Sequence, residues 1–119
     1  SGGGCIINIF CVGAIISGAD MGFYAASKSA LASLTEVMAQ EWSSLNIRVN
    51  AIAPGSYRTE MTTSAMDSIE GYEESLIEAA LIPRVADSSE ILNPVFYLAS
   101  ESYTTGITLV ADGGVLAKR

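Results

Sequence analysis

A tyrosine and a lysine four residues apart, Tyr24 and Lys28, are the side chains best suited to acid/base chemistry in this chain. The sequence around them predicts the start of a helix, on which positions i and i+4 share a face, so the ammonium can lie close to the phenol. A free phenol has a pKa of about 10 and transfers protons poorly at neutral pH, but a nearby cation lowers that pKa. The pair could therefore act as a general acid/base toward a carbinol or carbonyl oxygen. The spacing alone is a weak signal, because an exposed tyrosine beside a solvated lysine also produces it.

Three apolar runs rich in β-branched residues predict the strands that would position this pair. They cover residues 2–12, 47–53 and 106–114. Helices are predicted between them, the clearest over residues 24–45, and a cap at Asp87 predicts another helix that reaches about Ser100. Strands that alternate with helices imply right-handed parallel crossovers. The predicted fold class is therefore α/β.

Six motifs occur in an order that resembles the C-terminal half of the classical short-chain dehydrogenase/reductases, over essentially all 119 residues. They are Gly3-Gly-x-Ile-Ile-Asn-Ile9, Tyr24-Ala-Ala-Ser-Lys28, Arg48-Val-Asn-x-Ile-Ala-Pro-Gly55, Thr59-Glu-Met61, Ile82-Pro-Arg84 and Val110-Ala-Asp-Gly-Gly114. The resemblance implies a Rossmann-like, three-layer αβα fold with about three parallel strands and flanking helices. Residues 1–119 would form a single partial domain, with the N-terminal βαβ half missing. The implied reaction is hydride transfer between NAD or NADP and a small-molecule alcohol or carbonyl substrate.

The resemblance also assigns roles to individual residues. Tyr24 would transfer the proton, and Lys28 would lower the tyrosine pKa and hydrogen-bond the nicotinamide ribose. Tyr57 would act through its backbone toward the carboxamide of the cofactor. The residues implied to hold the cofactor are Tyr24, Lys28, Pro54, Gly55, Tyr57 and Thr59.

The position that binds the substrate oxygen departs from the family pattern. The family has a serine thirteen residues before the tyrosine, where this chain has Cys11 at the end of the first predicted strand. A thiol donates hydrogen bonds more weakly than a hydroxyl, so it would hold the oxygen less well. Ser17, seven residues before Tyr24, is the alternative candidate. As a plain sequence feature, Cys11 is better explained as a small buried hydrophobic residue than as a catalytic thiol.

No stretch of the sequence reads as a glycine-rich phosphate loop. Such a loop follows a strand and opens a helix, whereas the glycines at 2–4 precede a strand, and Gly13 and Gly18 lack partner glycines at the required spacing. We therefore expect this chain alone to bind neither NAD nor NADP, although the intact family fold would use one of them. Two hypotheses follow. The chain is a fragment of an NAD(P)-dependent oxidoreductase that interconverts an alcohol and a carbonyl, or it is a catalytically inert truncated remnant that acts only as a self-associating α/β module.

Composition argues against several other functions. Six Lys and Arg against thirteen Asp and Glu give a net charge of −7, which argues against nucleic-acid binding. The chain has no histidine, which excludes histidine-based metal sites and nucleophiles, and no metal site is predicted. The apolar run near residue 10 is too short to span a membrane. Cys5 and Cys11 lie too far apart on one predicted strand to form a disulfide, which indicates reduced thiols and a cytoplasmic protein.

Two regions are expected to move or to associate. Residues 56–82 correspond to a mobile lid in relatives and are the candidate substrate lid, expected to be partly disordered without cofactor. In the predicted helix over 24–45, Leu31, Leu34 and Leu45 are expected to pack on the sheet. The small residues of that helix allow close approach of the sheet or of a second subunit, and they are Ala25, Ala26, Ala30 and Ala32. An incomplete sheet would leave an edge and an apolar face bare, so a homo-oligomer is expected.

Overall fold

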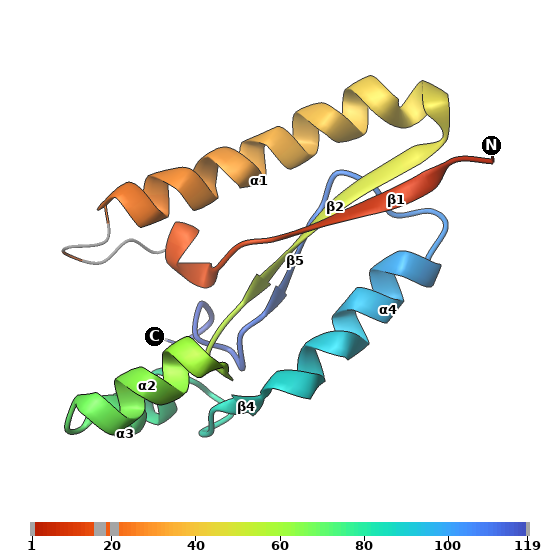
Figure 1. Ribbon diagram of the computed structural model, residues 1–119. Coiled ribbons are helices and arrows are strands. Elements are labelled where there is room, and N and C mark those ends of the chain that lie inside the picture. Colours follow the sequence, from red (N-terminus) through yellow and green to blue (C-terminus); the bar gives the residue numbers. More distant parts are fainter. Residues whose placement is uncertain (1, 16–18, 20–21, 119) are drawn as a thin grey trace.

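Three parallel strands form the central sheet of the molecule (Figure 1). The computed structural model describes residues 2–15, 19 and 22–118. The strands are β1 (Gly4–Ile9), β2 (Ile47–Pro54) and β5 (Thr108–Ala111), and they lie in the order β1-β2-β5. Their positions in the chain and their parallel direction confirm the predicted α/β fold class. The first and third strands are shorter than the apolar pattern predicts.

The chain leaves the sheet after β1 and forms a short 3₁₀ helix, η1 (Val12–Ala14). Cys11 is the N-cap of this helix, because its Sγ accepts a hydrogen bond from the Gly13 backbone N–H at 3.4 Å. A capping side chain satisfies an N–H group that has no partner at the start of a helix. The cap at Cys11 therefore favours η1 over a continuation of β1. The prediction that Cys5 and Cys11 share one strand is therefore wrong. Both are free cysteines, as expected.

Helices lie on both faces of the sheet, as Figure 1 shows. On one face, α1 (Gly22–Trp42) packs along β2 and continues into a 3₁₀ helix, η2 (Ser43–Leu45). On the other face, the 3₁₀ helix η3 (Ser88–Ile91) leads into α4 (Leu92–Ser100). Both helices were predicted, and with the sheet they form the predicted three-layer arrangement. Within the described residues, no helix is both long and apolar enough to cross a membrane.

A capping box fixes the start of the η3–α4 segment. The Asp87 side chain accepts from the Ser89 N–H at 2.9 Å, and Glu90 Oε2 accepts from the Asp87 N–H at 2.7 Å. This reciprocal pair satisfies N–H groups that a helix start leaves without partners. Pro94 is the third residue of α4, where its missing N–H breaks no hydrogen bond of the helix. The cap predicted at Asp87 is therefore confirmed.

The hydrophobic core lies between α1 and the sheet. Its central members are Phe10, Ala51 and Ala53, packed against Val12, Leu31 and Ala32. The buried residues of α1 itself are Ala25, Thr35 and Ala39. The expectation that Leu34 and Leu45 pack on the sheet is wrong, since their exposed fractions are 49% and 61%. Small side chains allow the helix to lie close to the sheet, and this leaves the larger leucines on its outer surface.

The buried Asn50 fixes the connection between α4 and β5. Its Nδ2 donates to the Thr104 carbonyl at 2.9 Å, and its Oδ1 accepts from the Ile107 N–H at 3.2 Å. Arg48 donates to the Leu98 carbonyl at 2.9 Å, near the C-terminal end of α4. A buried amide with both of its ends bonded costs little to bury and fixes the register of what it joins. The Arg-Val-Asn motif therefore has a structural role in placing β5 beside β2.

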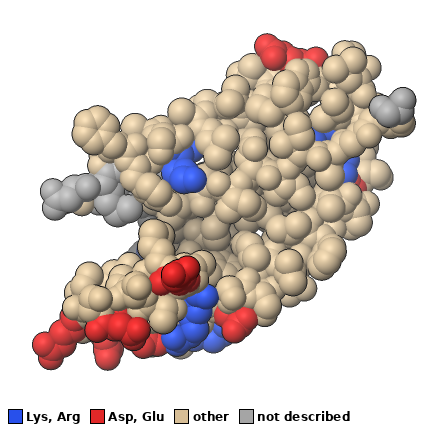
Figure 2. Space-filling view, viewed as in Figure 1, with Lys and Arg blue, Asp and Glu red and all other residues tan. Residues whose placement is uncertain are grey.

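Residues 56–82, called the lid segment below, lie beyond the carboxyl end of the sheet (Figure 1). A two-stranded sheet pairs β3 (Tyr57–Arg58) with β4 (Ala86–Asp87). Between these strands lie α2 (Glu60–Ser68) and α3 (Tyr72–Ala79), and neither helix contains a buried residue. Regular helices therefore occupy much of the segment that was expected to be partly disordered. Figure 2 shows acidic side chains gathered over this end of the molecule.

Candidate active site

The predicted acid/base pair lies in the first turns of α1, near the carboxyl end of β1. Tyr24 and Lys28 are the third and seventh residues of that helix. The end of β1 is held against β2 by a hydrogen bond from the Phe10 N–H to the Ile52 carbonyl at 3.0 Å. Parallel strands end at the same edge of a sheet, so Cys11 after β1 and the Pro-Gly turn after β2 share that edge.

Tyr24 lies beside Cys11, the residue at the position of the family serine. The pKa of Tyr24 is raised above its ordinary value of 10.0, first by partial burial of the phenol and then by its electrostatic and hydrogen-bonding interactions with Cys11. All three effects disfavour the phenolate. The Cys11 side chain is half-buried.

Lys28 lies over the aromatic ring of Tyr24. Its Nζ is 5.8 Å from the ring centroid, which is within cation–π range. The spacing therefore predicted correctly that the two side chains share one face of the helix. The expected lowering of the Tyr24 pKa by Lys28 is wrong for this structure, because burial and Cys11 act on the phenol in the opposite direction.

The turn formed by Pro54 and Gly55 packs tightly against the end of β5. The Gly55 N–H donates to the Ala111 carbonyl at 3.0 Å. A Cβ atom at position 55 would lie 2.7 Å from the Cα of Asp112, a distance that real Cβ contacts do not show. Glycine is therefore required here for packing between two backbones.

The side chains of Tyr57 and Thr59 are engaged by the protein itself. The Tyr57 hydroxyl donates to the Ala111 carbonyl at 3.2 Å. Partial burial, followed by the negative charge of Glu90, raises the pKa of Tyr57. Thr59 is the N-cap of α2 and accepts from the Thr62 N–H at 3.3 Å. These contacts are compatible with the implied role of Tyr57, which uses only its backbone.

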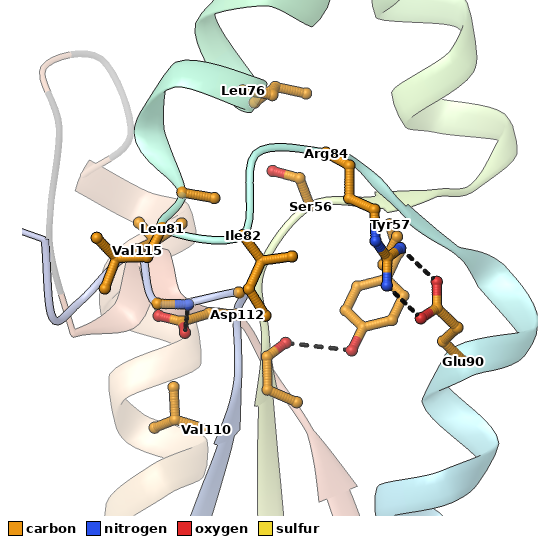
Figure 3. Close-up of a pocket in the computed structure, with 15 residues that line it drawn as sticks. Ser56, Tyr57, Leu76, Leu81, Ile82, Arg84, Glu90, Val110, Asp112 and Val115 are labelled. Carbon is orange, nitrogen blue, oxygen red and sulfur yellow. Dashed lines mark hydrogen bonds and ion pairs between the residues drawn. The ribbon is translucent and has the colours of Figure 1, made fainter.

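A cavity of about 490 Å³ lies beside Tyr57, between the end of the lid segment and the end of β5. Figure 3 shows Tyr57, Arg84 and Glu90 on one side of this cavity, and Leu81 and Val115 on the other. The members of the acid/base group, Cys11, Tyr24 and Lys28, are not among its lining residues. The cavity is therefore a separate feature from the group at the start of α1.

An ion pair on the rim of this cavity joins Arg84 to Glu90. The guanidinium donates to both carboxylate oxygens at 2.7 Å (Figure 3). This hydrogen bonding, together with the bond from the Asp87 N–H, lowers the pKa of Glu90 to about 2. The pair joins the loop that follows the lid segment to η3.

Among the residues that the structure describes, those at this edge fit the nicotinamide end of a dinucleotide, and none forms a pyrophosphate site. A phenol, an ammonium and a Pro-Gly turn lie at the carboxyl edge of the sheet, where open α/β sheets bind ligands. A pyrophosphate site needs glycines that open a helix. Instead, Gly3 has a φ of +101° and packs against the Asn46 carbonyl, and Gly4 begins β1. Among the described residues, no cluster of His, Cys, Asp and Glu could hold a metal ion.

The structure thus brings Cys11, Tyr24 and Lys28 together at one edge. Ser17, the other candidate for binding the substrate oxygen, lies outside the described residues. The sequence reasoning assigned no role to Asp112, which packs against Gly55. The Val-Ala-Asp-Gly-Gly motif was the available signal, but a motif does not reveal which distant residue it contacts.

Comparisons with known proteins bear on the family and the fold. A family model described as enoyl-(acyl carrier protein) reductase matches residues 1–116. The A-factor type gamma-butyrolactone 1'-reductase (1S-forming) of Streptomyces virginiae is 40% identical over 114 residues, which cover 94% of this chain and 44% of that protein. The structure of a gluconate 5-dehydrogenase from Burkholderia cenocepacia in complex with NADP and tartrate has a TM-score of 0.92 and 29% identity, covering 99% of this chain and 47% of the other. The structure of a 4-hydroxyisoleucine dehydrogenase complexed with NADH has a TM-score of 0.89 and 34% identity. The match covers 97% of this chain and 48% of the other.

The parallel sheet with flanking helices places the protein in the Rossmann-like α/β class. The protein belongs to the short-chain dehydrogenase/reductase family, as its motifs implied. Its relatives are oxidoreductases, and the two structures named above contain NADP and NADH. The chain spans about half the length of the relatives that it matches.

Proposed function

We propose that this chain carries the proton-transfer site of an NAD(P)-dependent oxidoreductase that interconverts a small-molecule alcohol and a carbonyl. The observation that carries the proposal is the meeting of Cys11, Tyr24 and Lys28 at the carboxyl edge of the sheet, the edge at which β2 ends with Pro54 and Gly55 follows. A proton carrier, a cation and a hydrogen-bond donor are the groups that a carbinol oxygen needs as it becomes a carbonyl.

In the proposed mechanism, each of these residues has one task. Tyr24 takes the hydroxyl proton of the alcohol in oxidation, or returns a proton to the carbonyl oxygen in reduction. Cys11 holds that oxygen with its thiol, and Ser17 is the alternative for this task. Lys28 stabilises the negative charge that Tyr24 carries when its proton is away, and it is also proposed to bind the nicotinamide ribose. NAD(P), when bound, accepts or supplies the hydride at the carbinol carbon.

The raised pKa of Tyr24 sets a requirement on this mechanism. Burial and Cys11 both favour the protonated phenol, which is the form that donates a proton in carbonyl reduction. Oxidation needs the phenolate, so in that direction the charge of Lys28 must offset both effects.

The decisive experiment is Tyr24→Phe, assayed in a complex that supplies the glycine-rich phosphate loop. The substitution removes the proton carrier and retains the ring, so turnover should fall by about 10²- to 10⁴-fold. Tyr103→Phe is the matched control, since Tyr103 is 98% exposed and lies far along the chain from the site. Full activity of the Tyr24→Phe variant would remove Tyr24 from the mechanism.

A second candidate function is that of an inert, self-associating α/β module. It is favoured by the face between α1 and α4, which Figure 2 shows to carry few charged side chains. The first strand, β1, also has a partner on one side only. Unpaired strand edges and uncharged surfaces favour association between copies. Light scattering should therefore give a mass above the 12.4 kDa of one chain.

Titration of the isolated chain with cofactor tests the two candidate functions. We expect no saturable change in NADH fluorescence at micromolar protein, because the chain lacks a pyrophosphate cradle. Saturable binding would favour a competent enzyme without any added part. A monomeric mass together with no binding would contradict the self-associating module.

A further inference from the structure

One turn, Asp112-Gly113-Gly114, contacts both ends of the lid segment. Just before the segment begins, Gly55 packs closely against Asp112. A Cβ atom on residue 55 would lie 2.7 Å from the Cα of Asp112. Where the segment ends, the Ile82 N–H donates to the Gly113 carbonyl at 2.9 Å. The two ends are thus held by three consecutive residues of a different part of the chain.

The contact at the second end leaves no room for a side chain on Gly114. A Cβ at this position would lie 2.8 Å from the Leu81 Cβ and 2.9 Å from its Cδ1. The φ of Gly114 is +87°, in the region that side chains other than glycine rarely adopt. Both the conformation and the close approach therefore require glycine.

The turn is itself held rigid by its aspartate. Asp112 Oδ1 accepts from the Gly114 N–H at 2.8 Å, and Oδ2 accepts from the Leu116 N–H at 2.8 Å. Four residues beyond Gly114, Lys118 Nζ donates to the carbonyl of Glu78, near the C-terminal end of α3. The segment after β5 thus contacts the lid segment at its last helix as well as at its ends.

The lid helices are held by exposed contacts, which include the ion pair between Arg58 of β3 and Glu73 of α3 and the bond from Lys118 to Glu78. Neither α2 nor α3 contains a buried residue, and Met61 on α2 is 76% exposed. A segment with so little burial takes its position from the points where it is held. Those points include the β3–β4 pairing and the turn at 112–114.

We propose that Asp112, Gly113 and Gly114 are positioning residues. They hold the two ends of the lid segment and so set where its helices lie relative to Pro54 and Gly55 at the end of β2. The proposal rests on the proposed function, and it takes residues 56–82 to be the substrate lid of that reaction. The turn acts through the lid and touches no reacting atom. A displaced turn should therefore weaken substrate binding more than it slows proton transfer.

The test compares two glycine-to-alanine substitutions by hydrogen exchange of the chain. Gly114→Ala adds a Cβ at a positive φ and forces Leu81 to move. Gly106→Ala is the matched control: its φ is +76°, but the nearest atom is the Ala39 Cβ at an ordinary 3.5 Å. Exchange in residues 60–79 should become about tenfold faster in Gly114→Ala. In Gly106→Ala, the rate of hydrogen exchange in the same peptides should change only as much as it does in the rest of the molecule.

A milder variant and a kinetic readout complete the test. If Gly114→Ala does not fold, Lys118→Met removes only the contact with Glu78, and exchange at the end of α3 should rise about twofold to threefold.

In the cofactor-binding complex, Gly114→Ala should raise KM severalfold more than it lowers kcat. Unchanged exchange in residues 60–79 of a folded Gly114→Ala variant, or an equal change in Gly106→Ala, would overturn the proposal. The exchange result does not depend on activity, so it stands even if the proposed reaction is wrong.

Discussion

The helix that carries Tyr24 and the lid segment differ in how the protein holds them. Along α1, buried residues recur at Ala25, Thr35 and Ala39, so the helix is fixed to the sheet over most of its length. In the lid segment, α2 and α3 contain no buried residue, and the segment is held at its ends. The proposed proton carrier therefore lies on an element that is fixed to the sheet, while the proposed lid does not.

This difference matches the separate demands of chemistry and access. Proton transfer needs donor and acceptor held within a fraction of an ångström, which buried packing provides. A lid must open for substrate and close over it, so it cannot be bound to the core along its length. In the proposed function, this chain would meet both demands by placing small, buried residues on one helix and exposed residues on the other two.

The largest effect should come from the buried central strand of the sheet. Ile52 is fully buried in β2, and Ile52→Ala should lower the free energy of unfolding by about 2–5 kcal/mol, because it leaves a cavity. Leu76→Ala on the half-buried face of α3 is the control and should cost less than about 1 kcal/mol. Urea unfolding followed by circular dichroism measures both. Equal losses would show that the lid segment is as firmly held as the core.

The next effect concerns the chemistry on the rigid side. In the complex that binds cofactor, Cys11→Ser should raise carbonyl reduction on the order of ten- to a hundredfold, because a hydroxyl is the stronger donor to the developing negative charge. The fold should tolerate the change, since serine is a good N-cap and Cys11 caps η1.

Cys5→Ser is the control for this experiment, because Cys5 is an exposed free cysteine on β1. Initial rates of NADPH or NADH oxidation with a carbonyl substrate measure the effect. An unchanged rate in Cys11→Ser, together with a large loss in Ser17→Ala, would assign the oxygen to Ser17 instead.

The smallest effect should come from the exposed ion pair that follows the lid segment. The pKa of Glu90 is lowered from 4.5 to about 2 in the folded protein. A lowered pKa means that the ionised carboxylate stabilises the fold above about pH 4.5, and that this contribution is lost as the pH falls toward 2. Glu90→Gln should therefore reduce the loss of thermal stability across this range.

Thermal melts between pH 6 and 2.5 give this comparison, with Glu41→Gln at the exposed end of α1 as the control. Solvent screening keeps the contribution of an exposed pair small. A loss of stability with the same pH dependence in Glu90→Gln as in the unmodified chain would mean that the ion pair does not stabilise the fold.

Much of the fold was predictable because its signals are local. The three strands appear as apolar runs, the cap at Asp87 appears as a polar residue followed three positions later by Glu90, and the helix with Tyr24 has its own periodicity. The Tyr24 and Lys28 pair was predictable for the same reason, since four residues of helix place both on one face. The order of the motifs identified the family.

Other features were not predictable, because they depend on how elements approach one another. The sequence could not show that alanines of α1 face the sheet while Leu34 faces outward, since both sets have helical spacing. It also indicated the wrong sign for the pKa shift of Tyr24. That shift comes first from burial of the phenol and then from Cys11, which follows β1 where η1 turns the chain away from the sheet.

By itself, the sequence determined the class of fold, the order of its strands along the chain and the residue types at the proposed active site. The tertiary structure decided which of them touch. Gly55 and Asp112 lie 57 positions apart in the chain, yet no side chain fits between them. Local propensity acts over a few residues, whereas a contact over such a separation exists only after the sheet between them has formed.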